Sequence, residues 1–151
     1  MRSMATARRA PSGVEAGLWS QMDDLSRAHA IFVRSVLRPL SVQQFRALNE
    51  VCAQGKTTMK NICRTAGTKP PTACVIVDHL VSERLVVRRR SNEQDRRVVE
   101  LRPTARGLRL WKTLKQRMHE AVLGLTKDLP KDDLQDMVQI LEDLTTRLER
   151  W

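Results

Sequence analysis

Two short β-type runs stand alone in a chain whose other apolar residues follow helical spacing. Residues 85–90 (Leu-Val-Val-Arg-Arg-Arg) and residues 98–102 (Val-Val-Glu-Leu-Arg) are separated by the polar stretch 91–97. Two strand-like runs joined by such a stretch predict one long, charged β-hairpin. We therefore expect a mainly α-helical protein with one small β-hairpin.

Apolar residues at three-to-four spacing predict six helices around this hairpin. Ser41 stands at the start of the second helix, and Gln44 follows it at the spacing of a capping box. Gly67 follows the third helix, in the position where glycine commonly ends one. Proline residues mark most of the other boundaries. The predicted helices cover residues 14–36, 41–54, 58–66, 70–84, 103–128 and 130–150.

The third and fourth predicted helices, joined by a tight glycine turn, have the spacing of a helix-turn-helix. The inward face of the fourth helix is predicted to be Ala73, Ile76, Val77 and Leu80. Its outward positions are small or polar, which fits a DNA major groove about 12 Å wide. Val75 is the exception; it can pack on a thymine methyl group, or a neighbouring loop can half-cover it. The outward positions are Pro71, Thr72, Val75, Asp78, His79 and Ser82.

The positive charge of the chain is concentrated in the same region. The formal net charge is +10, and residues 56–109 hold 13 of the 27 Lys and Arg but only five of the 17 Asp and Glu. Arginine suits phosphates and narrow minor grooves, and Asp95 is placed to hold one of the arginines in position. A solvated hairpin is the alternative, but the adjoining helix-turn-helix favours binding of double-stranded DNA. The hairpin arginines are Arg88, Arg89, Arg90, Arg96 and Arg97.

The chain resembles the MarR family of transcriptional regulators over about residues 14–150. The resemblance is strongest in residues 40–45, 78–86 and 95–107. Its most specific motif is the acidic-x-Arg signature Asp95-Arg96-Arg97, followed by a strand and by Thr-x-x-Gly. The resemblance implies that Arg97 enters a minor groove and that Asp95 supports it.

The resemblance also implies a winged helix-turn-helix flanked by N- and C-terminal dimerisation helices. On this basis residues 39–107 form the DNA-binding domain, residues 13–38 and 108–151 form the dimerisation region of a homodimer, and residues 1–12 form a disordered basic tail. The chain departs from the family at Arg84, where glycine is usual, at Pro70-Pro71 and at Val75. These departures leave the operator sequence open. The predicted DNA-binding residues are Lys69, Pro71, Thr72, Val75, His79, Arg89, Asp95, Arg96 and Arg97.

Many relatives bind small aromatic acids in a cleft between the dimer helices and the winged domain. Arg34 and Arg38 are four residues apart and share one side of a helix, so they can clamp a carboxylate. The predicted ligand-binding residues are His29, Arg34, Arg38 and Trp111. We therefore expect a sequence-specific transcriptional regulator, a repressor released from a palindromic operator by a small aromatic carboxylate. The alternatives are a redox-responsive regulator acting through Cys74 and a sequence-indifferent DNA-binding protein.

Other classes of protein find little support in the sequence. The three histidines fall on different predicted helices, and no catalytic motif or close ligand pair is present, so we expect no enzyme, no cofactor and no metal site. Three cysteines without a C-x-x-C spacing favour a reducing, cytoplasmic location. No apolar run approaches the roughly 18 residues that cross a bilayer, so a membrane is not an expected partner.

Overall fold

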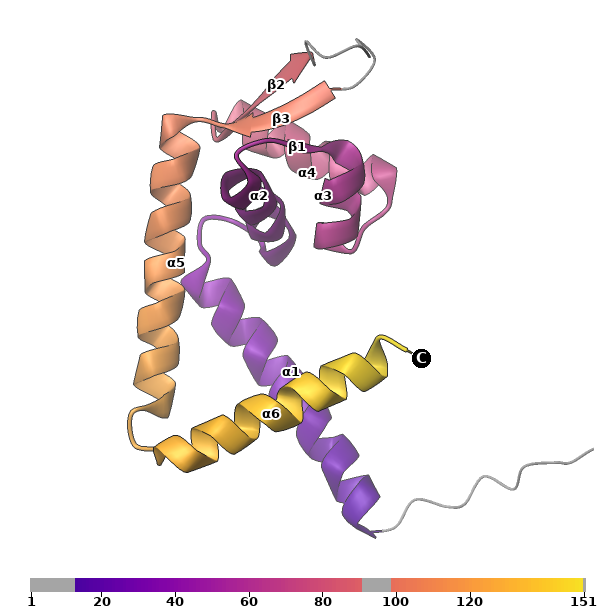
Figure 1. Ribbon diagram of the computed structural model, residues 1–151, viewed down its shortest axis with the longest axis vertical. Coiled ribbons are helices and arrows are strands. Elements are labelled where there is room, and N and C mark those ends of the chain that lie inside the picture. Colours follow the sequence, from indigo (N-terminus) through magenta and orange to yellow (C-terminus); the bar gives the residue numbers. More distant parts are fainter. Residues whose placement is uncertain (1–12, 91–98, 151) are drawn as a thin grey trace, which may run out of the picture.

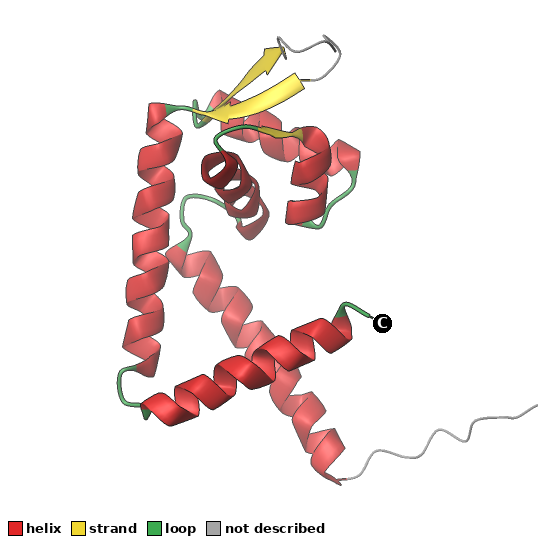
Figure 2. Ribbon diagram, viewed as in Figure 1, coloured by secondary structure: helices red, strands yellow, loops and turns green. Residues whose placement is uncertain are grey.

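The computed structural model describes residues 13–90 and 99–150 (Figure 1). These residues form six helices and one small antiparallel sheet, as Figure 2 shows. The prediction of a mainly helical chain with one hairpin is therefore confirmed. The elements are α1 (Gly13–Val36), α2 (Val42–Gln54), β1 (Thr57–Thr58), α3 (Met59–Ala66), α4 (Pro70–Ser82), β2 (Val86–Arg90), β3 (Val99–Pro103), α5 (Ala105–Thr126) and α6 (Lys131–Leu148).

Local capping signals set the ends of several helices. The backbone N–H of Gln44 donates to Ser41 Oγ at 3.2 Å, and the Gln44 side chain accepts from the Ser41 backbone N–H at 2.8 Å, so the predicted capping box is present. Gly67 ends α3 in the left-handed conformation, with φ 61°, which glycine adopts at little cost. Thr104 caps α5 by accepting from the Gly107 N–H at 2.9 Å.

The sheet has the order β1-β3-β2. Strands β2 and β3 pair from Val86 opposite Pro103 to Arg90 opposite Val99, which confirms the predicted hairpin. Strand β1 was not predicted, because its two threonines are too few to show an alternating pattern; they pair with Leu101 and Glu100 of β3. Residues 91–98, which include the predicted polar connection and the predicted strand residue Val98, lie outside the described residues.

One hydrophobic core joins the helix-turn-helix to α1 and α5. Figure 1 shows α2, α3 and α4 grouped on one side of the sheet, with α5 leading away from it toward α6. Helix α1 reaches the core near its C-terminal end, at Phe32 and Val33, and Leu37 joins the core from the turn that follows. Helix α5 reaches it mainly through Leu114. Helix α6 buries no residue. Most of the core therefore lies within the helix-turn-helix and the sheet, while much of α1, α5 and α6 projects from them.

Candidate nucleic-acid interface

Helix α4 presents one buried face and one open face. Pro70 and Pro71 occupy its first positions, where a missing N–H costs no hydrogen bond. The four residues predicted to face inward are all buried: Ala73, Ile76, Val77 and Leu80. Packing of these residues fixes the rotation of α4 about its axis and so determines which side chains face outward.

The outward face of α4 is exposed as the sequence predicts. Val75 is 69% exposed, so no neighbouring segment in the described part of the chain covers it. Lys69, at the N-cap of α4, is also exposed. The predicted outward residues Pro71, Thr72, Asp78, His79 and Ser82 are exposed as well. Small and polar side chains therefore make up the surface that this helix offers to a groove.

Strand β2 lies next to α4 and adds positive charge to this surface. Its residues Arg88, Arg89 and Arg90 are all exposed. An ion pair links the two elements, with 2.6 Å between Arg88 Nη1 and Asp78 Oδ1. Neither residue of this pair was among the predicted DNA-binding residues. Each was visible in the sequence, but their contact depends on how β2 packs against α4.

The carboxylate of Glu100 contacts two basic residues, Arg102 and Lys56, on the face of the sheet opposite to Arg88. Glu100 of β3 is 8% exposed, and it accepts from Arg102 Nη2 at 2.8 Å and Nε at 3.2 Å. Lys56 Nζ lies 3.6 Å from its other oxygen. The hydrogen bonds from Arg102 lower the pKa of Glu100 below its ordinary value, and the charges of Lys56 and Arg102 act in the same direction. Glu100 therefore pairs with one cation of β3 and with one that immediately precedes β1.

The predicted DNA-binding residues that the structure describes lie on α4 and on β2, where Arg89 faces the side of the sheet opposite to Arg88. Five of them belong to α4 or its N-cap, and Arg89 belongs to β2. The remaining three, Asp95, Arg96 and Arg97, lie outside the described residues, so the predicted entry of Arg97 into a minor groove stays a prediction.

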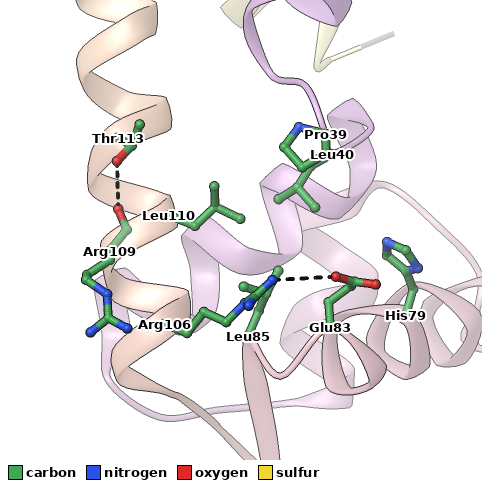
Figure 3. Close-up of a pocket in the computed structure, with 9 residues that line it drawn as sticks. All are labelled: Pro39, Leu40, His79, Glu83, Leu85, Arg106, Arg109, Leu110 and Thr113. Carbon is green, nitrogen blue, oxygen red and sulfur yellow. Dashed lines mark hydrogen bonds and ion pairs between the residues drawn. The ribbon is translucent and has the colours of Figure 1, made fainter.

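A pocket of about 530 Å³ adjoins the recognition surface (Figure 3). Its size is within the usual range for small-molecule sites. Side chains from α4, from the first half of α5 and from the turn between α1 and α2 line it. Arg106 Nη2 lies 3.9 Å from Glu83 Oε2, and Figure 3 shows these side chains reaching toward each other. The lining residues are Pro39, Leu40, His79, Glu83, Leu85, Arg106, Arg109, Leu110 and Thr113.

None of the four residues predicted to bind a ligand lines this pocket. His29 and Arg34 are exposed on α1, and Arg38 is exposed just beyond it. Trp111 of α5 is half-buried and donates its indole N–H to Asn49 Oδ1 at 2.9 Å. Sequence reasoning missed the pocket because its arginines, Arg106 and Arg109, are brought to α4 by the packing of α5.

The described parts of the chain contain neither a candidate metal site nor a candidate membrane-spanning helix. Across residues 13–90 and 99–150, no three His, Cys, Asp or Glu residues form a group that could hold a metal ion. None of the helices described there has the length and apolar character of a membrane span.

Comparison with known proteins identifies the winged region. Residues 39–97 match the sequence model of the MarR family. No curated protein sequence matches the chain. The sequence match is thus confined to the region that contains the helix-turn-helix and the first strand of the hairpin.

Solved structures share the fold of most of the chain. AbsC, a MarR family transcriptional regulator from Streptomyces coelicolor, superposes with a TM-score of 0.80 at 18% identity, over 95% of this chain and 99% of that one. A mutant of MarR from E. coli, complexed with operator DNA, gives 0.71 at 20% identity, over 85% and 93%. The organohalide-sensing regulator RdhR-CbdbA1625, bound to 2,4-dichlorophenol, gives 0.72 at 14% identity, over 93% and 88%. The match at residues 39–97 is to the MarR family, and the superpositions show that the chain has the winged helix-turn-helix fold of these regulators.

Proposed function

We propose that the protein is a homodimeric repressor that binds a palindromic operator and is released by a small aromatic acid. The observation that carries the DNA-binding part is the outward face of α4, whose small side chains lie beside the arginines of β2. A helix with that face fits a major groove, and the adjoining arginines suit phosphates.

Exposed apolar residues of α1, of the end of α5 and of α6 support the dimer. Trp19 is 72% exposed and Ile140 is 59% exposed. A soluble monomer rarely leaves so many large apolar side chains in water. A second copy of the chain is the partner that we propose for them, in agreement with the predicted dimerisation region. The exposed set is Val14, Leu18, Trp19, Leu25, Ile31, Val122, Leu123, Leu125, Leu129, Met137, Val138, Ile140, Leu141 and Leu148.

A dimer with two-fold symmetry presents two recognition helices, so its preferred site is a palindrome with half-sites about one helical turn apart. The E. coli relative complexed with operator DNA supports a role of this kind. Repression is then the simplest consequence of occupying an operator.

The pocket beside α4 supports control by a small acid. A ligand there contacts His79 on α4 and Arg106 and Arg109 on α5, so it joins the recognition helix to the helix that leads toward α6. A carboxylate that binds Arg106 competes with Glu83 for the guanidinium. The relative bound to 2,4-dichlorophenol supports an aromatic ligand. To release DNA, the ligand must bind the non-binding conformation more tightly than the DNA-bound one.

Selection of bound fragments from random DNA tests the operator, and titration of the selected complex with aromatic acids tests the effector. We expect one pseudo-palindromic sequence, with a log–log salt slope of about −7 if each protomer contacts roughly four phosphates. Equal affinity for scrambled DNA would instead make the protein a sequence-indifferent DNA binder.

Two variants separate the pocket from the predicted ligand-binding residues of α1. Arg109→Ala should abolish release by the acid if the pocket holds it, whereas Arg38→Ala should abolish release if the residues predicted from sequence hold it. Failure of every acid in the panel to stabilise the protein or release DNA would overturn the effector part alone.

A thiol on α4 supports redox control as a second candidate. Cys74 is exposed and lies beside Val75 on α4, whereas burial raises the pKa of Cys52 to about 11. Of these two thiols, only Cys74 is therefore accessible to an oxidant. Loss of operator binding in peroxide, reversed by a thiol reductant and absent in Cys74→Ser, would establish this regulation.

A further inference from the structure

The ion pair between Asp78 and Arg88 bridges the recognition helix and the wing. Asp78 lies on the same side of α4 as Val75, because residues three apart are neighbours on a helix. Arg88 lies on the same face of β2 as the buried Val86, because side chains two apart on a strand share a face. The packing of β2 against α4 therefore brings the guanidinium to the carboxylate at 2.6 Å.

The location of Asp78 conflicts with simple attraction between the protein and DNA. A carboxylate on the outward face of α4 repels the phosphates that flank a groove. The contact with Arg88 neutralises that charge and leaves the pair with no net charge. Arginine carries five N–H donors in a rigid plane, and Asp78 engages the Nη1 end of it, so other donors stay available to a third group.

The ion pair between Asp78 and Arg88 is too exposed to add much to the folding stability of the protein. The Asp78 side chain is 61% exposed and the Arg88 side chain is 38% exposed. Ion pairs with such exposure contribute little to folding. A fixed guanidinium, by contrast, loses less side-chain entropy when it binds a phosphate or a base edge.

We propose that Asp78 is a positioning residue for DNA recognition, which holds the Arg88 guanidinium between α4 and β2 so that Arg88 contacts the DNA strand lying between the recognition helix and the wing. This inference rests on the proposed binding of operator DNA. It adds Asp78 and Arg88 to the interface. Asp78 then favours DNA binding, although its negative charge by itself would oppose it.

The direction in which Asp78→Asn changes the affinity for operator DNA tests the proposal. Asp78→Asn removes a negative charge from the recognition surface, so electrostatics alone predicts tighter binding. Positioning predicts the reverse, a loss of about tenfold in operator affinity, the scale of one charge-assisted hydrogen bond. Asp128→Asn, in the turn between α5 and α6, removes the same charge at a distance and should leave affinity unchanged.

A double-mutant cycle then assigns the effect to Arg88. Arg88→Ala should weaken binding at least as much as Asp78→Asn, and the double variant should bind no more weakly than Arg88→Ala. Arg88→Lys keeps the charge but loses the planar fork, so it should recover only part of the affinity. Melting curves for each variant confirm folding at the temperature of the binding assay. Should Asp78→Asn not fold, Asp78→Ala takes its place in the cycle.

Three outcomes would overturn the inference. One is unchanged or tighter binding by folded Asp78→Asn, and another is an additive loss in the double variant. The third is a change in the selected base at one position that persists in the Arg88→Ala background, which would make Asp78 a base reader. If the wild-type protein itself prefers no duplex, the proposed function fails instead, and the two failures are distinguishable.

Discussion

A β-carbon added to Gly107 would stand 2.0 Å from the carbonyl oxygen of Leu85. The first turn of α5 thus rests directly on the backbone that leads into β2. The Thr104 hydroxyl donates to the Arg84 carbonyl at 2.7 Å, and the Thr104 backbone N–H donates to the Leu85 carbonyl at 3.0 Å. This joint fixes the direction in which α5 leaves the winged unit, and so it relates α4 to the helices proposed to form the dimer.

Gly107→Ala should therefore destabilise the protein strongly. The added methyl group meets backbone, which cannot rotate away, so we expect a loss of about 3 kcal/mol, the upper end for an overpacked site. Urea denaturation followed by circular dichroism measures the change. Gly124→Ala is the matched control, because its added carbon meets no atom within 4 Å apart from the adjoining residues and backbone of its own helix. Equal stability of Gly107→Ala and the wild type would mean that α5 is not seated as described.

Arg84→Gly should stabilise the protein. Arg84 has φ 57°, a left-handed conformation that is unfavourable for a residue with a β-carbon and that glycine adopts freely. We expect a gain of about 0.5–1 kcal/mol after the greater chain entropy of glycine in the unfolded state is allowed for.

Arg46→Gly is the control for Arg84→Gly, because Arg46 is exposed within α2. It should cost about 1 kcal/mol, as glycine does in a helix interior. Parallel urea titrations of the two variants measure both effects. Destabilisation by both substitutions would show that the backbone at Arg84 carries no strain.

Acid should weaken the fold partly through Glu100. The pKa of Glu100 is lowered in the folded protein, so its ionised form adds stability above the unfolded pKa, near 4.5, and that stability is lost as the pH falls through the lower folded pKa. The free energy of unfolding of the wild type should therefore fall below about pH 4.5. Glu100→Gln should show a shallower fall over the same range. Parallel curves for the two proteins would show that Arg102 and Lys56 do not stabilise the carboxylate.

Much of this fold was predictable because its signals are local. Ser41, Gln44, Gly67 and Thr104 set helix ends within a few residues of themselves, and period alone predicted the buried face of α4. The pocket and the pair of Asp78 with Arg88 were not predictable, because each depends on elements distant in sequence that meet only when β2 and α5 pack against α4. Strand β1 is paired by β3 and has no pattern of its own.

Arg97→Ala tests the wing motif, which lies outside the described residues. If Arg97 enters a minor groove, its loss should weaken operator binding by roughly 1–3 kcal/mol per protomer, the scale of one good groove contact. Fluorescence anisotropy on the selected operator measures the change. Lys131→Ala, at the start of α6, removes the same charge far from α4 and should have almost no effect. Equal affinity of both variants and the wild type would mean that the wing is a solvated hairpin.

Leu141→Glu tests the proposed dimer. Leu141 is 50% exposed on α6 and lines a groove with Val138 and Thr145. Burial of an unpaired carboxylate in an apolar interface is costly, so the variant should dissociate at concentrations where the wild type sediments at twice the 17.3 kDa of one protomer. Lys60→Glu, on the exposed side of α3, is the control and should leave the mass unchanged.

A dissociated protomer keeps one recognition helix and reaches one half-site, so Leu141→Glu should also lose its preference for a palindrome over a single half-site. A wild type that sediments as a monomer, or a Leu141→Glu variant that remains dimeric, would place the interface elsewhere or remove it.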